Sequence, residues 1–156
     1  MTEPAGFHHT LYIRCRPSEL WAALTEGEQT RRWFLGTTID SSFEIGAPVR
    51  FLALAPDQDD DEPRVEAIRG SLRAFDPPRR LVHELRFCDL DDPAGEVEWA
   101  LSEPAPEAGV VRLDVEHRGL IADSPSWTRA REGWPLILSG LKTWLETSAP
   151  LGLTKP

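Results

Sequence analysis

Residues 124–147 read S-P-S-W-T-R-A-R-E-G-W-P-L-I-L-S-G-L-K-T-W-L-E-T. Apolar side chains recur in this stretch at steps of three and four residues, which is the pattern of an amphipathic helix with one face in a core. The positions on that face are Trp127, Ala130, Trp134, Ile137, Leu138, Leu141, Trp144 and Leu145. Ser124 is a suitable N-cap, and Pro125 suits the first turn because its missing N–H would be unpaired there anyway. A helix that carries three tryptophans needs a broad concave partner to bury them.

Pro135 lies in the middle of this helical pattern. A proline inside a helix removes one backbone hydrogen bond and clashes with the preceding turn, at a cost of about 3 kcal/mol. Because the apolar stripe continues past it, we expect either one helix bent near Arg131–Trp134 or two helices that meet there. The alternative is a helix that begins at Trp134, with Pro135 in its first turn.

The chain before this helix is predicted to consist mostly of strands. Phe7–Arg14 alternates between apolar and polar residues, as a half-buried strand does. Two short helices are expected over residues 17–24 and 28–34, followed by about six strands between residues 37 and 117. This order predicts an α+β protein, in which a curved antiparallel sheet of about six to seven strands wraps around the long C-terminal helix. We expect residues 1–156 to form a single domain, with its core at about residues 7–147.

Composition excludes several classes of partner. The chain has 156 residues and a net charge of −9, whereas nucleic acids and anionic membrane surfaces require a basic face. No signal peptide is evident, and no stretch approaches the ~18 apolar residues that span a bilayer. Cys15 and Cys88 lie far apart and are expected to be reduced thiols, which is typical of a cytoplasmic protein.

The tract Asp57–Glu62 holds five acidic residues in six positions, a composition that raises the possibility of a calcium site. However, the tract has no glycine for the sharp turn of a calcium loop and no glutamate at the distal ligand position. A solvated hairpin loop is therefore the better interpretation. The sequence indicates neither a metal nor a cofactor.

Several short motifs follow one another in a characteristic order. They are Trp21-x-x-Leu24-Thr25, Trp33-Phe34, Gly46, Gly70, Pro77-Pro78 with Leu81-Val82, His117-x-Gly119, and Gly133-Trp134 followed by Leu138 and Leu141. In order and spacing they resemble the helix-grip superfamily of START and birch-pollen-allergen-like domains. The chain is most similar to activator of heat-shock-protein ATPase homologues, also described as polyketide cyclase-like. It departs from that family at Ile45-Gly46, where paired glycines are common, and near Leu85, where an aromatic residue is common.

This resemblance implies a cavity between the sheet and the C-terminal helix that holds a small apolar or amphipathic molecule. Family members include ligand carriers, cyclases and co-chaperone domains, so function rests here on analogy of fold. We expect the chain to bind a small hydrophobic molecule. The alternatives are a cyclase- or hydrolase-like enzyme that uses the same pocket, and a protein-interaction module of the co-chaperone type. The sequence contains no recognisable nucleophile or nucleotide-binding motif, which favours binding over catalysis. It does not decide between a monomer and a homodimer.

Three histidines are predicted on the concave face of the sheet: His9, His83 and His117. In this topology the first strand pairs with the last, so His9 should approach His117. An inward imidazole can act as a general acid or base or can orient a ligand, although a histidine near a strand end is more often only structural. Zinc is not favoured, because no carboxylate or thiol joins the three at ligand spacing. His83 is the first candidate for contact with a ligand, and tryptophans facing inward are either pocket walls or plain core. The predicted pocket residues are His83, His117, Trp99, Trp134, Leu138, Phe51 and Leu85.

Overall fold

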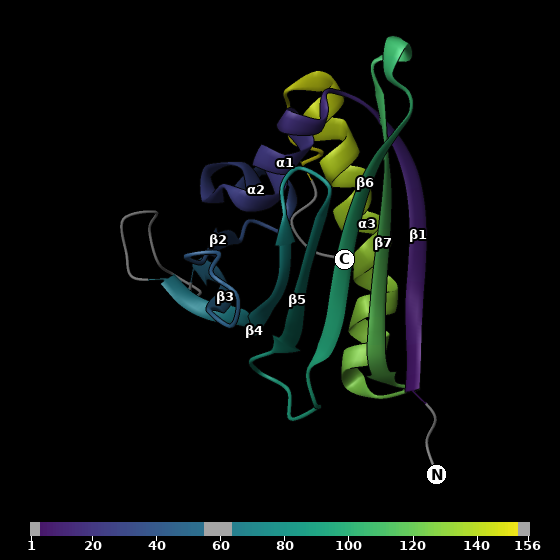
Figure 1. Cartoon of the computed structure of the whole chain (residues 1–156). Helices are drawn as coiled ribbons and strands as arrows, with labels where there is room; N and C mark the ends of the chain where they lie inside the picture. Colours follow the sequence, from purple (N-terminus) through teal and green to yellow (C-terminus); the bar gives the residue numbers. More distant parts are fainter. Residues whose placement is uncertain (1–3, 55–63, 153–156) are drawn as a thin grey trace.

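The structure is a computed structural model that describes residues 4–54 and 64–152 (Figure 1). Its elements are β1 (Pro4–Arg14), α1 (Pro17–Thr25), α2 (Gly27–Trp33), β2 (Thr38–Asp40), β3 (Pro48–Leu54), β4 (Arg64–Asp76), β5 (Arg80–Phe87), β6 (Gly95–Ala105), the 3₁₀ helix η1 (Pro106–Ala108), β7 (Val110–Ile121) and α3 (Pro125–Thr147). This order confirms the predicted α+β class, with two short helices after the first strand and a long helix at the end. The acidic tract Asp57–Glu62, and with it the predicted solvated loop, lies outside the described residues.

The sheet has seven antiparallel strands in the order β1-β7-β6-β5-β4-β3-β2. The first strand therefore pairs with the last one, as predicted, and Phe7 lies opposite His117. The sheet curves around α3, which lies along one of its faces, while α1 and α2 lie beside the C-terminal half of α3 (Figure 1). This is the helix-grip arrangement that the sequence indicates. No helix in the described part of the chain is long and apolar enough to cross a membrane.

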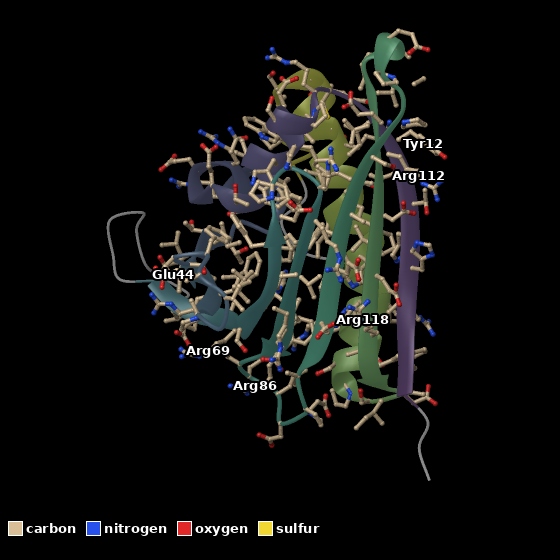
Figure 2. All side chains as sticks on the ribbon, viewed as in Figure 1. Tyr12, Glu44, Arg69, Arg86, Arg112 and Arg118 are labelled. Carbon is tan, nitrogen blue, oxygen red and sulfur yellow. The ribbon has the colours of Figure 1, made fainter. Side chains whose placement is uncertain are left out.

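The two faces of the sheet differ in chemistry because strand side chains alternate. Val97 and Trp99 on β6 point toward α3 and are almost fully buried. The opposite face carries charges, and Figure 2 shows Arg69, Arg86, Arg112 and Arg118 on the side of the sheet turned away from α3. Arg118 of β7, for example, donates hydrogen bonds to Glu96 and Glu98 of β6. Opposite charges on neighbouring strands stabilise the solvent-facing side of a sheet in this way.

Helix α3 is anchored at its N-terminus by two side chains. Ser124 is the N-cap, and its hydroxyl accepts a hydrogen bond from the backbone N–H of Trp127 at 3.2 Å. The carboxylate of Asp92, in the loop between β5 and β6, accepts one from the N–H of Ser126 at 2.9 Å. Both acceptors satisfy amides that have no partner within the first turn of a helix, and a carboxylate there also complements the helix dipole. The loop between β5 and β6 is thereby attached to α3.

Pro135 lies inside a single continuous helix. The expectation of two helices, and the alternative of a helix that begins at Trp134, are both wrong. The reason is that Pro135 is on the exposed side of α3, as is Arg131, whose carbonyl loses its intrahelical donor. Water can solvate that carbonyl, while the buried side of the helix continues to pack on the sheet. The predicted bend near Arg131–Trp134 stays a prediction.

Candidate functional site

Two hydrogen bonds between tryptophan and histidine lie at the centre of the core. Trp99 Nε1 donates to His83 Nε2 at 3.1 Å, and Trp134 Nε1 donates to His117 Nδ1 at 3.0 Å. All four side chains are at most 3% exposed. The indole rings of Trp99 and Trp134 are in edge contact, with centroids 5.6 Å apart. The second hydrogen bond joins α3 to β7, whereas the first lies within the sheet.

The pair of His83 and Trp99, called the closed pair below, uses both ring nitrogens of the histidine. His83 Nδ1 lies 3.0 Å from the backbone oxygen of Glu84. Because a carbonyl oxygen only accepts and an indole N–H only donates, the ring is neutral, with its proton on Nδ1. Burial lowers the pKa of His83, which agrees with this neutral state.

The pair of His117 and Trp134, called the open pair below, uses only one nitrogen. His117 Nε2 is buried and has no hydrogen-bond partner among the described residues. Since Nδ1 accepts from the indole, the proton of the neutral ring is on Nε2, which is therefore a buried donor without an acceptor. Burial, and to a smaller extent the neighbouring His83, lowers the pKa of His117 to about 4. An unpaired buried donor costs about 1–3 kcal/mol, so this position calls for an explanation.

An apolar pocket lies beside the open pair, between the sheet and α3. Its volume is about 40 Å³, and its wall consists almost wholly of apolar atoms. The lining residues are Phe34, Leu35, Ile68, Leu85, Phe87, His117, Arg129, Ala130, Gly133, Trp134 and Ile137. Leu35 and Phe87 are half-buried and Arg129 is exposed, so these three side chains mark the mouth of the pocket. The space is enough for a few atoms, and it is far smaller than the roughly 300–1,000 Å³ of a drug-sized site.

Gly133 contributes to the pocket by having no side chain. A β-carbon added to it would meet only Ile137 Cδ1, at 3.8 Å, which is an ordinary contact distance. Gly95, next to the His117 ring, is the opposite case, because a β-carbon there would come within 2.8 Å of His117 Nε2. The unpartnered nitrogen thus lies next to a strand that has no side chain at this point. Gly95 therefore allows the His117 ring to lie close against β6, whereas Gly133 leaves space on the helix side of the pocket.

Arg129 is held at the mouth of the pocket by two neighbours. Its guanidinium forms a two-pronged ion pair with Asp89, with nitrogen–oxygen distances of 2.7 and 2.9 Å. It also lies over the ring of Phe87, 4.9 Å from the centroid, in a cation–π contact. Asp89 belongs to the loop between β5 and β6, so this ion pair is a second attachment of that loop to α3.

The seven predicted pocket residues separate into two groups. His117, Trp134 and Leu85 line the pocket. Phe51, His83, Trp99 and Leu138 are buried but lie elsewhere in the core, where Phe51, for instance, packs on the ring of His83 with centroids 5.8 Å apart. His83 does point inward, so the predicted strand register is confirmed. Contact of His83 with a ligand stays a prediction, and its two nitrogens are already engaged by protein groups. His9 is two residues removed from Phe7, the residue opposite His117.

The sequence interpretation missed the mouth of the pocket. Leu35 has a positive φ of 51° in the turn after α2, and nothing in the local sequence predicts that this turn lies against α3. The sequence did contain a signal that Arg129 lies near the pocket. Arg129 is four residues before Gly133 and is therefore on the same side of the helix.

A larger hollow is present at the opposite end of the sheet. It measures about 470 Å³ and is lined by residues that include Pro17, Pro78 and Leu101. Its walls expose polar and apolar atoms in similar amounts, and the unpartnered buried atoms of the described residues belong to His9, Thr38 and His117, none of which lines it. The smaller pocket beside His117 is therefore the better candidate site. Within residues 4–54 and 64–152, no three histidine, cysteine or acidic side chains are placed to hold a metal ion.

Comparison with known proteins places these features in a family context. The family model described as "Activator of Hsp90 ATPase homolog 1-like protein" matches residues 14–146. No curated protein matches the chain significantly.

Solved structures share the fold at low sequence identity. An HSP90 activator from Plasmodium falciparum is 16% identical, with a TM-score of 0.71 over 90% of this chain and 95% of that one. The Aha1 dimer from Colwellia psychrerythraea is 14% identical, with a TM-score of 0.68 over 92% and 97%. CalU16 from Micromonospora echinospora is 19% identical, with a TM-score of 0.66 over 95% and 88%.

Proposed function

Given that the chain belongs to the family of Activator of Hsp90 ATPase homolog 1-like proteins, we propose that it binds a small, largely apolar molecule in the pocket between the sheet and α3. The ligand carries at least one hydrogen-bond acceptor. A helix-grip fold encloses space between its sheet and its long helix, and in this chain that space is the apolar pocket beside His117.

The observation that carries this proposal is the buried Nε2 of His117, for which the described residues offer no hydrogen-bond partner. Buried donors in folded proteins almost always have an acceptor, from the protein, from water or from a ligand. A ligand oxygen that accepts from Nε2 would remove the cost of the orphaned donor, and its apolar body would meet the apolar wall. Pockets for small molecules commonly have this composition, with many apolar groups and a few placed polar ones.

A ligand of more than a few atoms requires the pocket to widen. The side chains that would move are Leu35 and Phe87, because both are half-buried at the mouth. The walls formed by Trp134 and Ile137 are packed in the core and would remain in place. Binding of this kind couples the ligand to a side-chain rearrangement, so the affinity is lower than the apolar contact alone would give.

The arrangement of the histidines favours binding over acid–base catalysis. A general base needs a free lone pair on one ring nitrogen. In the closed pair both nitrogens of His83 are engaged. In the open pair Nδ1 of His117 accepts from Trp134 and Nε2 carries the proton. His117, with a pKa of about 4, is neutral at pH 7 and acts as a hydrogen-bond donor.

The exposed apolar side chains support a protein-interaction module less strongly than the pocket supports ligand binding. The large ones among the described residues are Tyr12, Ile45, Val65, Ile121 and Leu151. They come from five separate segments, whereas a docking surface usually gathers such residues in one contiguous patch. The pocket is thus the feature with the more specific chemistry.

Location and assembly are further parts of the proposal. Cys15 and Cys88 are both unpaired, which supports a cytoplasmic location. The similar structure from Colwellia psychrerythraea is described as a dimer. We propose a homodimer for this chain, and light scattering coupled to size-exclusion chromatography tests it.

Binding can be tested with 2-acetonaphthone, an uncharged ketone with an aromatic body and a single acceptor. We expect saturable binding by calorimetry and a rise in melting temperature, since a ligand that binds only the folded state stabilises it. In Gly133→Ala the added methyl group occupies the pocket, and we expect the affinity to fall about tenfold or more. Because alanine also favours the helix, this variant should be at least as stable as wild type, so misfolding cannot explain the loss.

The matched control is Ser139→Ala, on the exposed side of the same helix. It should bind 2-acetonaphthone as wild type does. Absence of saturable binding to wild type, or equal affinity of wild type and Gly133→Ala, would overturn the proposed function.

A further inference from the structure

Arg129 is the one charged side chain among the residues that line the described pocket. It lies at the mouth, where the side chain is 42% exposed, and the contact with Phe87 holds the guanidinium over an apolar ring. In a chain with a net charge of −9, the general electrostatic field repels anions. Arg129 therefore places a positive charge at the entrance of the pocket, in a chain that as a whole repels anions.

The two polar side chains among the lining residues, His117 and Arg129, have the same hydrogen-bonding sense. The Nε2–H of His117 donates, and the guanidinium of Arg129 can only donate. Among the described residues that line the pocket, none carries a carboxylate. A ligand matches this set when its polar atoms are acceptors, and it matches Arg129 best when it carries a negative charge.

Asp89 shows which anion fits Arg129. Its two carboxylate oxygens lie 2.7 and 2.9 Å from the two terminal nitrogens of the guanidinium, which is the planar, two-pronged geometry that arginine and carboxylate share. The ion pair is exposed, with Asp89 at 64%. Exposed pairs contribute little to stability, so another carboxylate can replace that of Asp89 at small cost.

We propose that the ligand of this pocket is a largely apolar carboxylic acid with a second acceptor. Its carboxylate takes the place of Asp89 on Arg129, while its apolar body enters the pocket and the second acceptor meets the Nε2–H of His117. This inference rests on the proposed function and specifies the class of ligand. Asp89 is then an internal competitor, which occupies Arg129 in the empty protein and leaves it when the ligand arrives. The loop between β5 and β6 keeps its other attachment, the hydrogen bond from Ser126 N to Asp92.

The test compares 6-acetyl-2-naphthoate with 2-acetonaphthone, which share the ring system and the ketone but differ by one carboxylate at the far end of the ring system. We expect calorimetry on the wild-type chain to give about tenfold tighter binding of 6-acetyl-2-naphthoate, the value of one charge-assisted pair after displacement of Asp89. Arg129→Gln should remove this preference, so that the two compounds bind the variant with similar affinities. Asp89→Asn should raise the affinity for 6-acetyl-2-naphthoate several-fold, because the competing charge is gone.

The control is Arg131→Gln. Arg131 lies on the same helix and contacts the ring of Trp127, 5.3 Å from its centroid, but it does not line the pocket. Its replacement should leave the preference for 6-acetyl-2-naphthoate intact. Equal affinities of wild type for the two compounds, or the same loss in Arg131→Gln as in Arg129→Gln, would overturn the carboxylate inference while 2-acetonaphthone binding still supports the pocket. If neither compound binds, the proposed function fails as well.

Discussion

The closed pair and the open pair have the same chemistry and different surroundings. In both, an indole N–H donates to a buried imidazole at about 3 Å. In the closed pair the second nitrogen of His83 meets the backbone of Glu84, whereas the second nitrogen of His117 meets no protein group among the described residues. The difference separates a structural unit, whose hydrogen bonds are complete, from a site that a ligand can complete. Burial alone does not distinguish them, since both rings are 1% exposed.

The largest change in stability is expected for a substitution at Gly70, next to the closed pair. A β-carbon there would lie 1.8 Å from the backbone oxygen of Glu84, the same oxygen that pairs with His83. Gly70→Ala must therefore push β4 away from β5, and we expect the free energy of unfolding to fall by about 3 kcal/mol. Urea denaturation measures this loss. A variant as stable as wild type would mean that the strands around the closed pair are not tightly fixed.

Replacing each histidine by leucine tests the two pairs directly. His83→Leu leaves the Trp99 N–H and the Glu84 carbonyl without partners, and we expect a loss of about 2 kcal/mol. His117→Leu orphans the Trp134 N–H but also removes the unpaired Nε2–H, so the net loss should be below about 1 kcal/mol. Parallel urea denaturation of the two variants gives the comparison. Equal losses would contradict the distinction between a complete and an incomplete pair.

We expect the free energy of unfolding to fall in acid, because the buried His117 of the open pair takes up a proton less readily than it does in the unfolded chain. The pKa of His117 is about 4 in the folded chain, against an ordinary value of 6.5. As the pH falls, the unfolded chain therefore takes up this proton first, so the contribution of His117 is complete above pH 6.5 and is lost between pH 6.5 and pH 4. At pH 5.5 the loss amounts to roughly 1 kcal/mol.

The control for this pH dependence is His117→Gln, whose side-chain oxygen can still accept from Trp134. Between pH 7 and pH 5.5, its unfolding free energy should decline less than that of wild type, by the same amount of roughly 1 kcal/mol. Parallel curves for the two proteins would show that His117 is not a buried neutral imidazole.

The smallest expected change is a gain in stability. Gly133→Ala adds a methyl group beside the open pair where only Ile137 is in contact range. We expect the free energy of unfolding to rise by about 0.5–1 kcal/mol, because alanine favours a helix over glycine. Thermal and urea unfolding measure it. Destabilisation would mean that the pocket is already closed, and the contrast with Gly70→Ala would then disappear.

The fold could be predicted because it depends on patterns within single segments. The apolar stripe of residues 124–147 indicates α3, and the alternation on β5 and β6 places His83 and Trp99 inward. Pro135 was harder to interpret, since the cost of a proline depends on whether the orphaned carbonyl faces water, and the three-dimensional packing decides that.

The site could be predicted only in part, because it depends on contacts between segments. The inward position of His117 follows from its strand, but the partner of each ring nitrogen does not. The pocket results from the missing side chain of Gly133 and from the turn at Leu35, which takes a positive φ of 51°. Neither feature leaves a periodic signal in the sequence, so the sequence alone could not show which of the two inward histidines, His83 or His117, lines the pocket.

The most direct test of the ligand site is an NMR spectrum of the histidine ring nitrogens with and without saturating 2-acetonaphthone. At pH 7, both His83 and His117 should be neutral, with the proton of His83 on Nδ1 and that of His117 on Nε2. On binding, the Nε2–H signal of His117 should shift and its exchange with water should slow, while the ring signals of His83 stay in place. Saturable binding that leaves His117 unchanged, or that shifts the ring signals of His83 instead, would contradict the assignment of the open pair as the binding site.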